Sequence, residues 1–311
     1  MAGDDGTGLA RRLRLKPRRS SADNQSIIFC MSEPMSSQPL TAPLPDLAAW
    51  VAYLRNAEIP VLPDTADTLA AFAANEDAMD ARTLTEVIAI DPLMTLKLMA
   101  HSGLNRPPRA NADAETVTEA LVMMGMAPFF RAFSVNRSVE DWFQHEPAAL
   151  AGLQAVLRRA HRAAQFALGF AVHRQDHDAA VIHEAALLHD FAEMLMWCHA
   201  PSLALRMRER QRAEPGLRSC AVQREVLHVE LGDLQHALML AWRLPELLVQ
   251  ITNDRKQDHP RVKTVLLGIR LARHTQHGWS DAAIPDDVRE IGELLNLAPP
   301  STLELLHELD D

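Results

Sequence analysis

Residues 150–172, LAGLQAVLRRAHRAAQFALGFAV, form the most regular stretch of this 311-residue chain. Apolar side chains recur in it at intervals of three and four, the spacing that places them on one face of an α-helix. The residues at these positions are Leu153, Val156, Leu157, Ala160, Ala163, Ala164, Ala167, Phe170 and Ala171. The stretch therefore predicts a long helix with one buried face.

The composition of the chain indicates that this helix is one of many. Apolar residues make up 48% of the sequence and aromatic residues only 5%, with alanine and leucine dominant, which favours helix over strand. Further helices are predicted at about 219–242, 245–252, 261–277 and 287–297. The sequence shows neither a series of alternating strands nor a glycine-rich phosphate loop. We therefore expect an all-α fold.

Local signals indicate where several helices begin. Asp91 followed by Pro92 is typical of a capping residue and a proline at the first helical position. Thr83, Thr116 and Ser301 each precede a glutamate by three residues, which is the spacing of a capping box. These positions predict helix starts on either side of the long central helix.

The composition changes along the chain and suggests three parts. Residues 1–43 are rich in Ser, Pro, Gly, Arg and Asp, so we expect a disordered tail there. Residues 44–136 are expected to form an N-terminal helical lobe. Residues 137–311 are expected to form a second, C-terminal lobe that contains the long helix.

Charge and cysteine content limit the classes of partner and the compartment. A formal net charge of -10 does not favour nucleic acid as the main partner, although the first twenty residues are basic. Cys30, Cys198 and Cys220 have no C-x-x-C spacing, which fits a reducing cytoplasm better than secretion. No uninterrupted apolar run reaches the roughly 18 residues of a membrane span. We expect a cytoplasmic protein without a membrane partner.

One polar pair interrupts an otherwise apolar helical run. His189 and Asp190 stand between AALL at 185–188 and FAEMLM at 191–196. Buried polar groups need hydrogen-bond partners, and a buried carboxylate needs a cation or several donors. The pair therefore either belongs to a metal site or anchors a polar network.

Several motifs, in a fixed order, resemble the HDOD family. The N-terminal half carries IPVLP at 59–63, VIAIDPL at 87–93, KLM at 97–99 and TEALVMMG at 118–125; the second half carries ALLHD at 186–190 and WRLP at 242–245. The resemblance covers about residues 44–280. It implies a helical, HD-like fold in two lobes, related to HD-type metal phosphohydrolases. It also implies a role in bacterial signalling or regulation, since most members of this family are not enzymes.

The resemblance extends only partly to the metal ligands. A working HD-type site adds an upstream His, one or more downstream His and a final Asp to the His-Asp pair. His161 is the nearest upstream candidate, but an ungapped register places Arg159 there. Leu231 stands where the pattern has a downstream His, 253–254 are Asn-Asp in place of a His pair, and Arg273 stands at the final Asp.

These departures predict a polar anchor in place of a metal centre. Asp190 is expected to accept hydrogen bonds from backbone amides or from an arginine such as Arg159 or Arg273, because a fixed guanidinium can neutralise it where a metal would. His189, Asp190 and His161 remain vestigial metal candidates. The candidate ligand-binding residues are Arg159, His189, Asp190 and Arg273. We expect no catalytic residue, no bound metal and no cofactor.

The resemblance and its departures together favour a non-catalytic regulatory module that binds a signalling protein or a small ligand between its lobes. A metal-dependent phosphohydrolase acting on a nucleotide or cyclic dinucleotide is the alternative, and it would require a divalent metal. A nucleotide-binding sensor without turnover is a third interpretation. The identity of the partner and the oligomeric state stay open.

Overall fold

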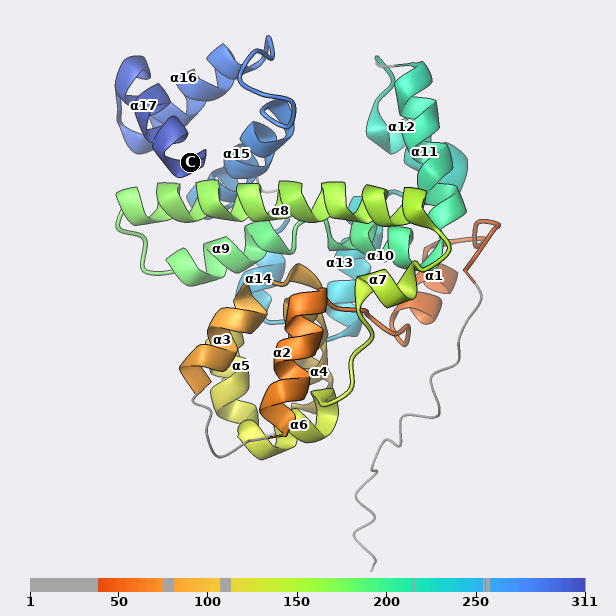
Figure 1. Cartoon of the computed structure of the whole chain (residues 1–311). Helices are drawn as coiled ribbons and strands as arrows, with labels where there is room; N and C mark the ends of the chain where they lie inside the picture. The colour runs from red at the N-terminus through yellow and green to blue at the C-terminus, as the bar shows by residue number, and fades with distance from the viewer. Residues whose placement is uncertain are drawn as a thin grey trace, which may run out of the picture. The chain divides into compact units, whose positions relative to one another are not determined.

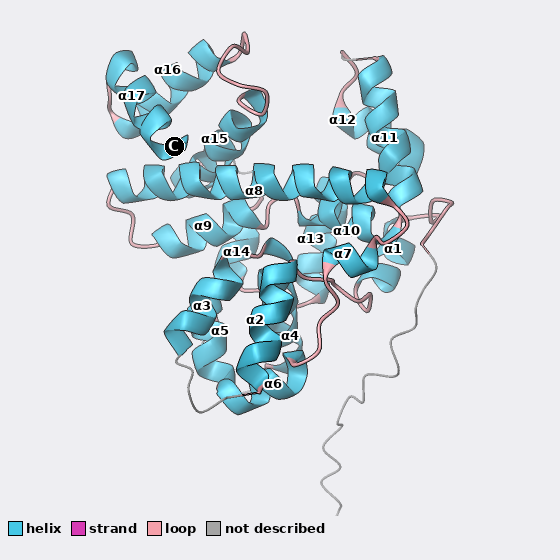
Figure 2. Ribbon diagram, viewed as in Figure 1, coloured by secondary structure: helices cyan, strands magenta, loops and turns pink. Residues whose placement is uncertain are grey.

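The computed structural model describes residues 39–74, 81–106, 113–214, 216–253, 255 and 258–310. These residues belong to one compact unit, Gln38–Asp311. Within the described ranges the regular structure is helical and no strand occurs, as Figure 2 shows. The all-α prediction is confirmed. The predicted lobe boundary at residue 136 stays a prediction.

The first half of the described chain forms a group of short helices. Their bounds are α1 Leu47–Leu54, α2 Pro63–Ala73, α3 Ala81–Ala89, α4 Pro92–Asn105, α5 Val117–Met124 and α6 Met126–Phe133. Asp91 caps α4 as predicted, because its Oδ1 accepts from the amides of Leu93 at 2.9 Å and Met94 at 3.0 Å. Its Oδ2 accepts from Leu62 N at 2.7 Å and so fixes the start of α2 against α4.

The second half is organised around α8, the 27-residue helix Pro147–His173. The other helices are α7 Val139–Trp142, α9 Ala179–Leu187, α10 Phe191–His199, α11 Pro201–Ala213, α12 Ser219–Leu227, α13 Leu231–Ala241, α14 Glu246–Ile251, α15 Pro260–His274, α16 Ile284–Leu295 and α17 Pro299–Asp310. Helices α9, α10 and α15 pack on α8, which crosses the middle of Figure 1. The predicted apolar stripe of α8 is buried along its length, from Leu153 to Ala171.

Close backbone packing holds α15 on α8. A Cβ atom added to Gly268 of α15 would lie 2.8 Å from the carbonyl oxygen of Ala163 on α8. Contacts under about 3 Å require the neighbouring atoms to move, and a backbone oxygen cannot move cheaply. Glycine at position 268 therefore allows the backbones of α15 and α8 to pack in close contact.

The predicted continuous helix over 219–242 is wrong, because the structure divides it into α12 and α13. His228 adopts a left-handed backbone conformation with φ of 66° and ends α12. The side chain of Gln223 then accepts from Leu231 N at 2.9 Å and satisfies an amide at the start of α13. Such side-chain support replaces the backbone hydrogen bonds that a continuous helix would have made.

Of the three helix starts predicted from capping-box spacing, only the one at Thr116 is confirmed. Its hydroxyl accepts from Glu119 N at 3.3 Å at the start of α5. Thr83 and Ser301 lie inside helices that begin earlier, at Ala81 and Pro299. A proline at the first helical position starts α17 ahead of the predicted cap.

The described chain begins inside the predicted tail of residues 1–43. Residues 1–38 lie outside the described ranges, but Leu40 N donates to the carbonyl oxygen of His199 at 2.7 Å. The segment before α2 is hydrogen-bonded to the linker before α7. Val61 N donates to Arg137 O at 3.0 Å, and Val139 N donates to Val61 O at 2.9 Å.

No single helix in the described ranges combines the length and apolar content needed to cross a membrane. The bent pair Arg82–Ala89 and Pro92–Asn105 reaches that length and composition only jointly, with an angle of 116° between its two parts.

Candidate polar centre around Asp190

His189 and Asp190 lie at a break between two helices. The predicted continuous helical run through them is therefore wrong: α9 ends at Leu187 and α10 begins at Phe191. Phe191 N donates to Leu188 O at 3.1 Å, which makes a tight turn of the intervening residues. The turn directs the side chain of Asp190 towards arginines on α8 and α15.

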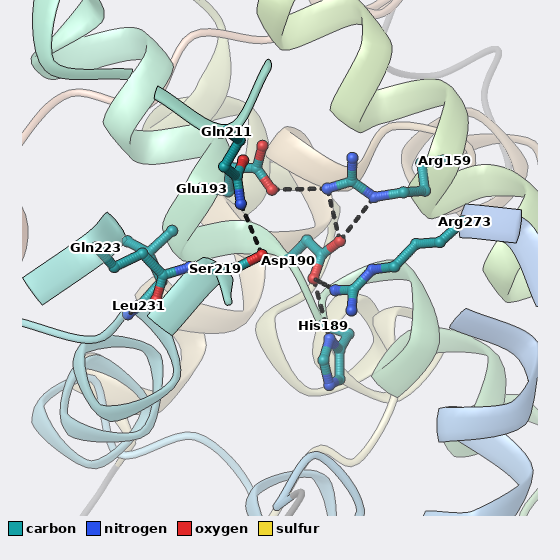
Figure 3. A network of polar contacts seen from close by, with 9 residues as sticks. All are labelled: Arg159, His189, Asp190, Glu193, Gln211, Ser219, Gln223, Leu231 and Arg273. Carbon is teal, nitrogen blue, oxygen red and sulfur yellow. Dashed lines mark hydrogen bonds and ion pairs between the residues drawn. The ribbon is translucent and has the colours of Figure 1, made fainter. Parts of the chain in front are cut away.

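Both carboxylate oxygens of Asp190 are occupied by cationic or imidazole groups. Oδ2 accepts from Arg159 Nε at 3.0 Å and from Arg159 Nη2 at 2.8 Å. Oδ1 accepts from Arg273 Nη2 at 3.0 Å and lies 3.1 Å from His189 Nδ1. Figure 3 shows the two guanidiniums approaching the carboxylate from different sides. The predicted pairing of Asp190 with an arginine is confirmed, and two arginines take part.

A second carboxylate balances the charge of this cluster. Arg159 Nη2 also donates to Glu193 Oε2 at 2.6 Å, one turn along α10 from Asp190. Two guanidiniums therefore face two carboxylates, in addition to the His189 imidazole. We call these five side chains, Arg159, His189, Asp190, Glu193 and Arg273, the Asp190 cluster.

Opposite charges outweigh burial and keep Asp190 and Arg159 ionised. Burial alone would raise the pKa of Asp190, but the charges of Arg273 and Arg159 and the hydrogen bond with His189 hold it well below its ordinary value. Burial opposes the charge on Arg159 as well, and Glu193 and Asp190 outweigh this effect and raise its pKa. The side chain of Arg159 is 13% exposed and that of Asp190 12%, whereas Arg273 is 51% exposed. Arg273 is thus the member of the cluster that solvent reaches most easily.

The donor set does not fit a divalent metal ion. Arg159 and Arg273, at the positions that the HD pattern gives to ligands, bring positive charge and no lone pair to the carboxylate. Across the described ranges, no three His, Cys, Asp or Glu side chains converge closely enough to hold a metal. Two other positions of the HD ligand pattern add no metal ligand that the structure describes. Residue 231 is a leucine, whose backbone amide donates to Gln223, and residue 254 lies outside the described residues.

The structure separates His161 from the Asp190 cluster. Residues two apart on an α-helix point about 200° away from each other, so His161 and Arg159 lie on opposite flanks of α8. His161 instead lines a groove of about 590 Å³. The lining residues are Leu62, Gln154, Leu157, Arg158, His161 and Arg162. Of the predicted site residues, therefore, only Arg159, His189, Asp190 and Arg273 come together.

Sequence reasoning missed a buried acid on α9, the helix that precedes His189 in sequence. Glu184 on α9 accepts from Val117 N at 2.7 Å, at the start of α5 in the first half of the chain. Within the described structure its Oε2 is buried without a hydrogen-bond partner. Burial, aided by the charge of Glu119, raises the pKa of Glu184 to about 8. A glutamate in the apolar run VIHEAALL was the available signal, because a charged residue there demands a partner.

Comparison with known proteins places this geometry among HDOD domains. The HDOD domain family model matches residues 59–257. The fold is similar to that of the MmoQ response regulator from Methylococcus capsulatus str. Bath, with a TM-score of 0.58 and 20% identity over 80% of this chain and 98% of that one. It is also similar to a virulence factor (cj0248) from Campylobacter jejuni subsp. jejuni, with a TM-score of 0.56 and 15% identity over 85% and 97% of the two chains. At these identities the likeness concerns the fold alone. No curated protein matches the chain.

Proposed function

Because the chain belongs to the HDOD family, we propose that it is a non-catalytic regulatory module, which binds a signalling protein or a small ligand between its two helical lobes. One observation carries the non-catalytic part of this proposal. Both oxygens of Asp190 are bound by guanidiniums, from Arg159 and Arg273, at the place where an HD-type enzyme needs metal ligands. A carboxylate neutralised in this way has no charge left to hold a metal.

The chemistry of hydrolysis supports this interpretation. Phosphoester cleavage is among the slowest uncatalysed reactions, so an enzyme needs a complete machinery to reach useful rates. HD-type sites supply it through metal-activated water. In this chain the residues that remain are His189 and Asp190, which contact each other, and the carboxylate of Asp190 is also bound by arginines.

The binding part of the proposal is supported by the groove beside α8. Leu62 precedes α2 in the predicted N-terminal lobe, and the other lining residues belong to α8 in the predicted C-terminal lobe. A volume of about 590 Å³ lies within the range of roughly 300–1,000 Å³ that small-molecule sites occupy. The groove also favours the nucleotide-binding sensor as a second candidate, because Arg158 and Arg162 line it.

A turnover assay tests the non-catalytic proposal. The purified protein is incubated with nucleotides, cyclic nucleotides and cyclic dinucleotides, with Mn²⁺ or Fe²⁺ supplied, and the products are separated by chromatography. We expect no product above background. Metal-dependent turnover that disappears in Asp190→Ala would refute the proposal and favour the phosphohydrolase. Elemental analysis is the independent check, since about one or two metals per chain would contradict the donor set described above.

A further inference from the structure

The groove beside α8 is lined by both polar and apolar side chains. Gln154, Arg158 and His161 repeat at intervals of four and three and so share one flank of the helix. Leu62 and Leu157 supply apolar surface in the same groove. Ligand sites commonly combine such an apolar lining with a few polar groups that fix the orientation of the bound molecule.

Arg158 is the available cation of this groove. Its side chain is exposed, and within the described part of the chain no ion pair or hydrogen bond engages its guanidinium. His161 is half-buried, and burial lowers its pKa, which keeps the imidazole neutral near pH 7. A neutral imidazole can donate one hydrogen bond and accept another.

Arg162, the second arginine of the groove, already holds an acidic group of the chain itself. Its Nε and Nη2 donate to the two carboxylate oxygens of Asp310, each at 2.8 Å. Asp310 ends α17, and its Oδ2 also accepts from Trp279 Nε1 at 3.1 Å. This two-pronged contact is the geometry with which arginine binds carboxylates and phosphates. The C-terminal helix therefore places an internal anion at one edge of the groove.

We propose that this groove binds a small organic phosphate, with the phosphate between Arg158 and Arg162 and the apolar body of the ligand against Leu62 and Leu157, and that Asp310 competes with the phosphate for Arg162. The proposal rests on the proposed function, because it names the ligand class for the groove between the lobes. Arginines four residues apart on a helix lie on the same face, about 6 Å apart, and can both reach one phosphate. Two guanidiniums suit the charge of a phosphate better than that of a single carboxylate.

Competition is expected because Asp310 occupies the bidentate edge of Arg162 that is formed by Nε and Nη2. Its Nη1 and Nη2 also donate to the carbonyl oxygen and the hydroxyl of Thr275, at 3.0 and 2.8 Å. The Nε position, however, is held by Asp310 alone among the described residues. A phosphate that takes this position displaces Asp310 and removes an anchor of α17. Ligand binding is thereby linked to the docking of the C-terminal helix.

Calorimetric titration of the full-length protein with AMP tests the proposal, with adenosine and inorganic phosphate as separate probes. We expect AMP to bind more tightly than either probe, because it can contact both the arginines and the apolar side chains of the groove. Arg158→Gln should weaken AMP binding by about tenfold or more, the effect of losing one charged hydrogen-bond donor. Asp310→Asn should tighten it several-fold, and this variant keeps the contacts of Arg162 with Thr275. Arg206→Gln, an exposed arginine on α11, is the matched control and should leave the affinity unchanged.

Two further results decide the outcome. Absence of saturable AMP binding at millimolar concentrations, in both the parent protein and Asp310→Asn, overturns the proposal. Equal binding of AMP by the parent and by Arg158→Gln overturns it as well. Neither result contradicts the proposed function, because a regulatory module can bind a protein instead of a small ligand. Conversely, if AMP binds and is hydrolysed when metal is added, the non-catalytic function is refuted, but the proposal that the groove binds a phosphate is not.

Discussion

Replacement of Asp190 by alanine should mainly reduce the stability of the protein. Asp190 accepts two hydrogen bonds from Arg159 and one from Arg273, and its removal leaves Arg159 buried with only Glu193 as partner. Breaking a buried ion pair by removing one partner costs about 3–5 kcal/mol. The half-exposed Arg273 adds little to this figure, since exposed pairs contribute roughly 0–1 kcal/mol. We therefore expect a loss of about 3–5 kcal/mol in the free energy of unfolding.

The measurement is urea unfolding followed by far-ultraviolet circular dichroism. The midpoint should fall while the slope stays constant, because the folded state buries the same surface. Asp67→Ala is the matched control: Asp67 is an exposed aspartate on α2, and its replacement should change the stability by no more than about 0.5 kcal/mol. The double variant Asp190→Ala/Arg159→Met should recover part of the loss, because the buried guanidinium is removed and the one that remains, Arg273, is half-exposed.

A loss below about 1 kcal/mol for Asp190→Ala would refute this reasoning, because it would equal the effect of an exposed pair. A variant as stable as the parent that lost a bound metal or a measurable activity would point to the phosphohydrolase instead.

Three other changes have defined outcomes. Removal of residues 1–38 retains the hydrogen bond of Leu40 with α10. The thermal midpoint should therefore stay within a few degrees of the parent's, which corresponds to about 1 kcal/mol. Aggregation or a large decrease in the midpoint would show that the tail contributes to the fold. Glu184 has a pKa of about 8 in the folded protein against an ordinary 4.5, so its contribution to stability is complete below the ordinary value and is lost as the pH rises through 8. Glu184→Gln mimics the neutral acid, so the variant should lose less stability than the parent between pH 4.5 and about 8 when urea unfolding is measured across pH. An identical pH dependence of stability in the two proteins would contradict the raised pKa of Glu184. Gly268→Ala should destabilise the protein by about 1–3 kcal/mol through its clash with Ala163, and a neutral result in urea unfolding would mean that α15 can shift on α8.

The parts of the fold that could be predicted from sequence depend on local patterns. The apolar stripe from Leu153 to Ala171 identified α8, because its spacing matches the helical repeat over many turns. The start of α4 was predictable from Asp91 and Pro92, whose roles involve only the next few residues. The pairing of Asp190 with arginines was predictable because Arg159 and Arg273 stand at positions where a related pattern has other residues.

Most of the parts that could not be predicted depend on contacts between distant residues. The end of α12 was missed for a local reason, because non-glycine residues adopt a left-handed backbone only uncommonly, even though histidine does so more often than most, and the support that Gln223 gives to Leu231 N has no sequence signature. The contact of Glu184 with Val117 joins residues 67 positions apart, and that of Arg162 with Asp310 spans 148. Local periodicity carries no information about such pairs.

The place where the family match ends has a consequence for how this protein can be divided. The match stops at residue 257, whereas α15 begins at Pro260 and supplies both Gly268, which meets α8, and Arg273, which binds Asp190. A fragment trimmed to residues 59–257 would expose a stripe of α8 to water, and exposed apolar patches of this kind promote self-association. It would also leave Asp190 with one arginine instead of two. The shared segment therefore does not contain the whole folding unit, and comparisons of the polar centre between HDOD proteins need the helices that follow it.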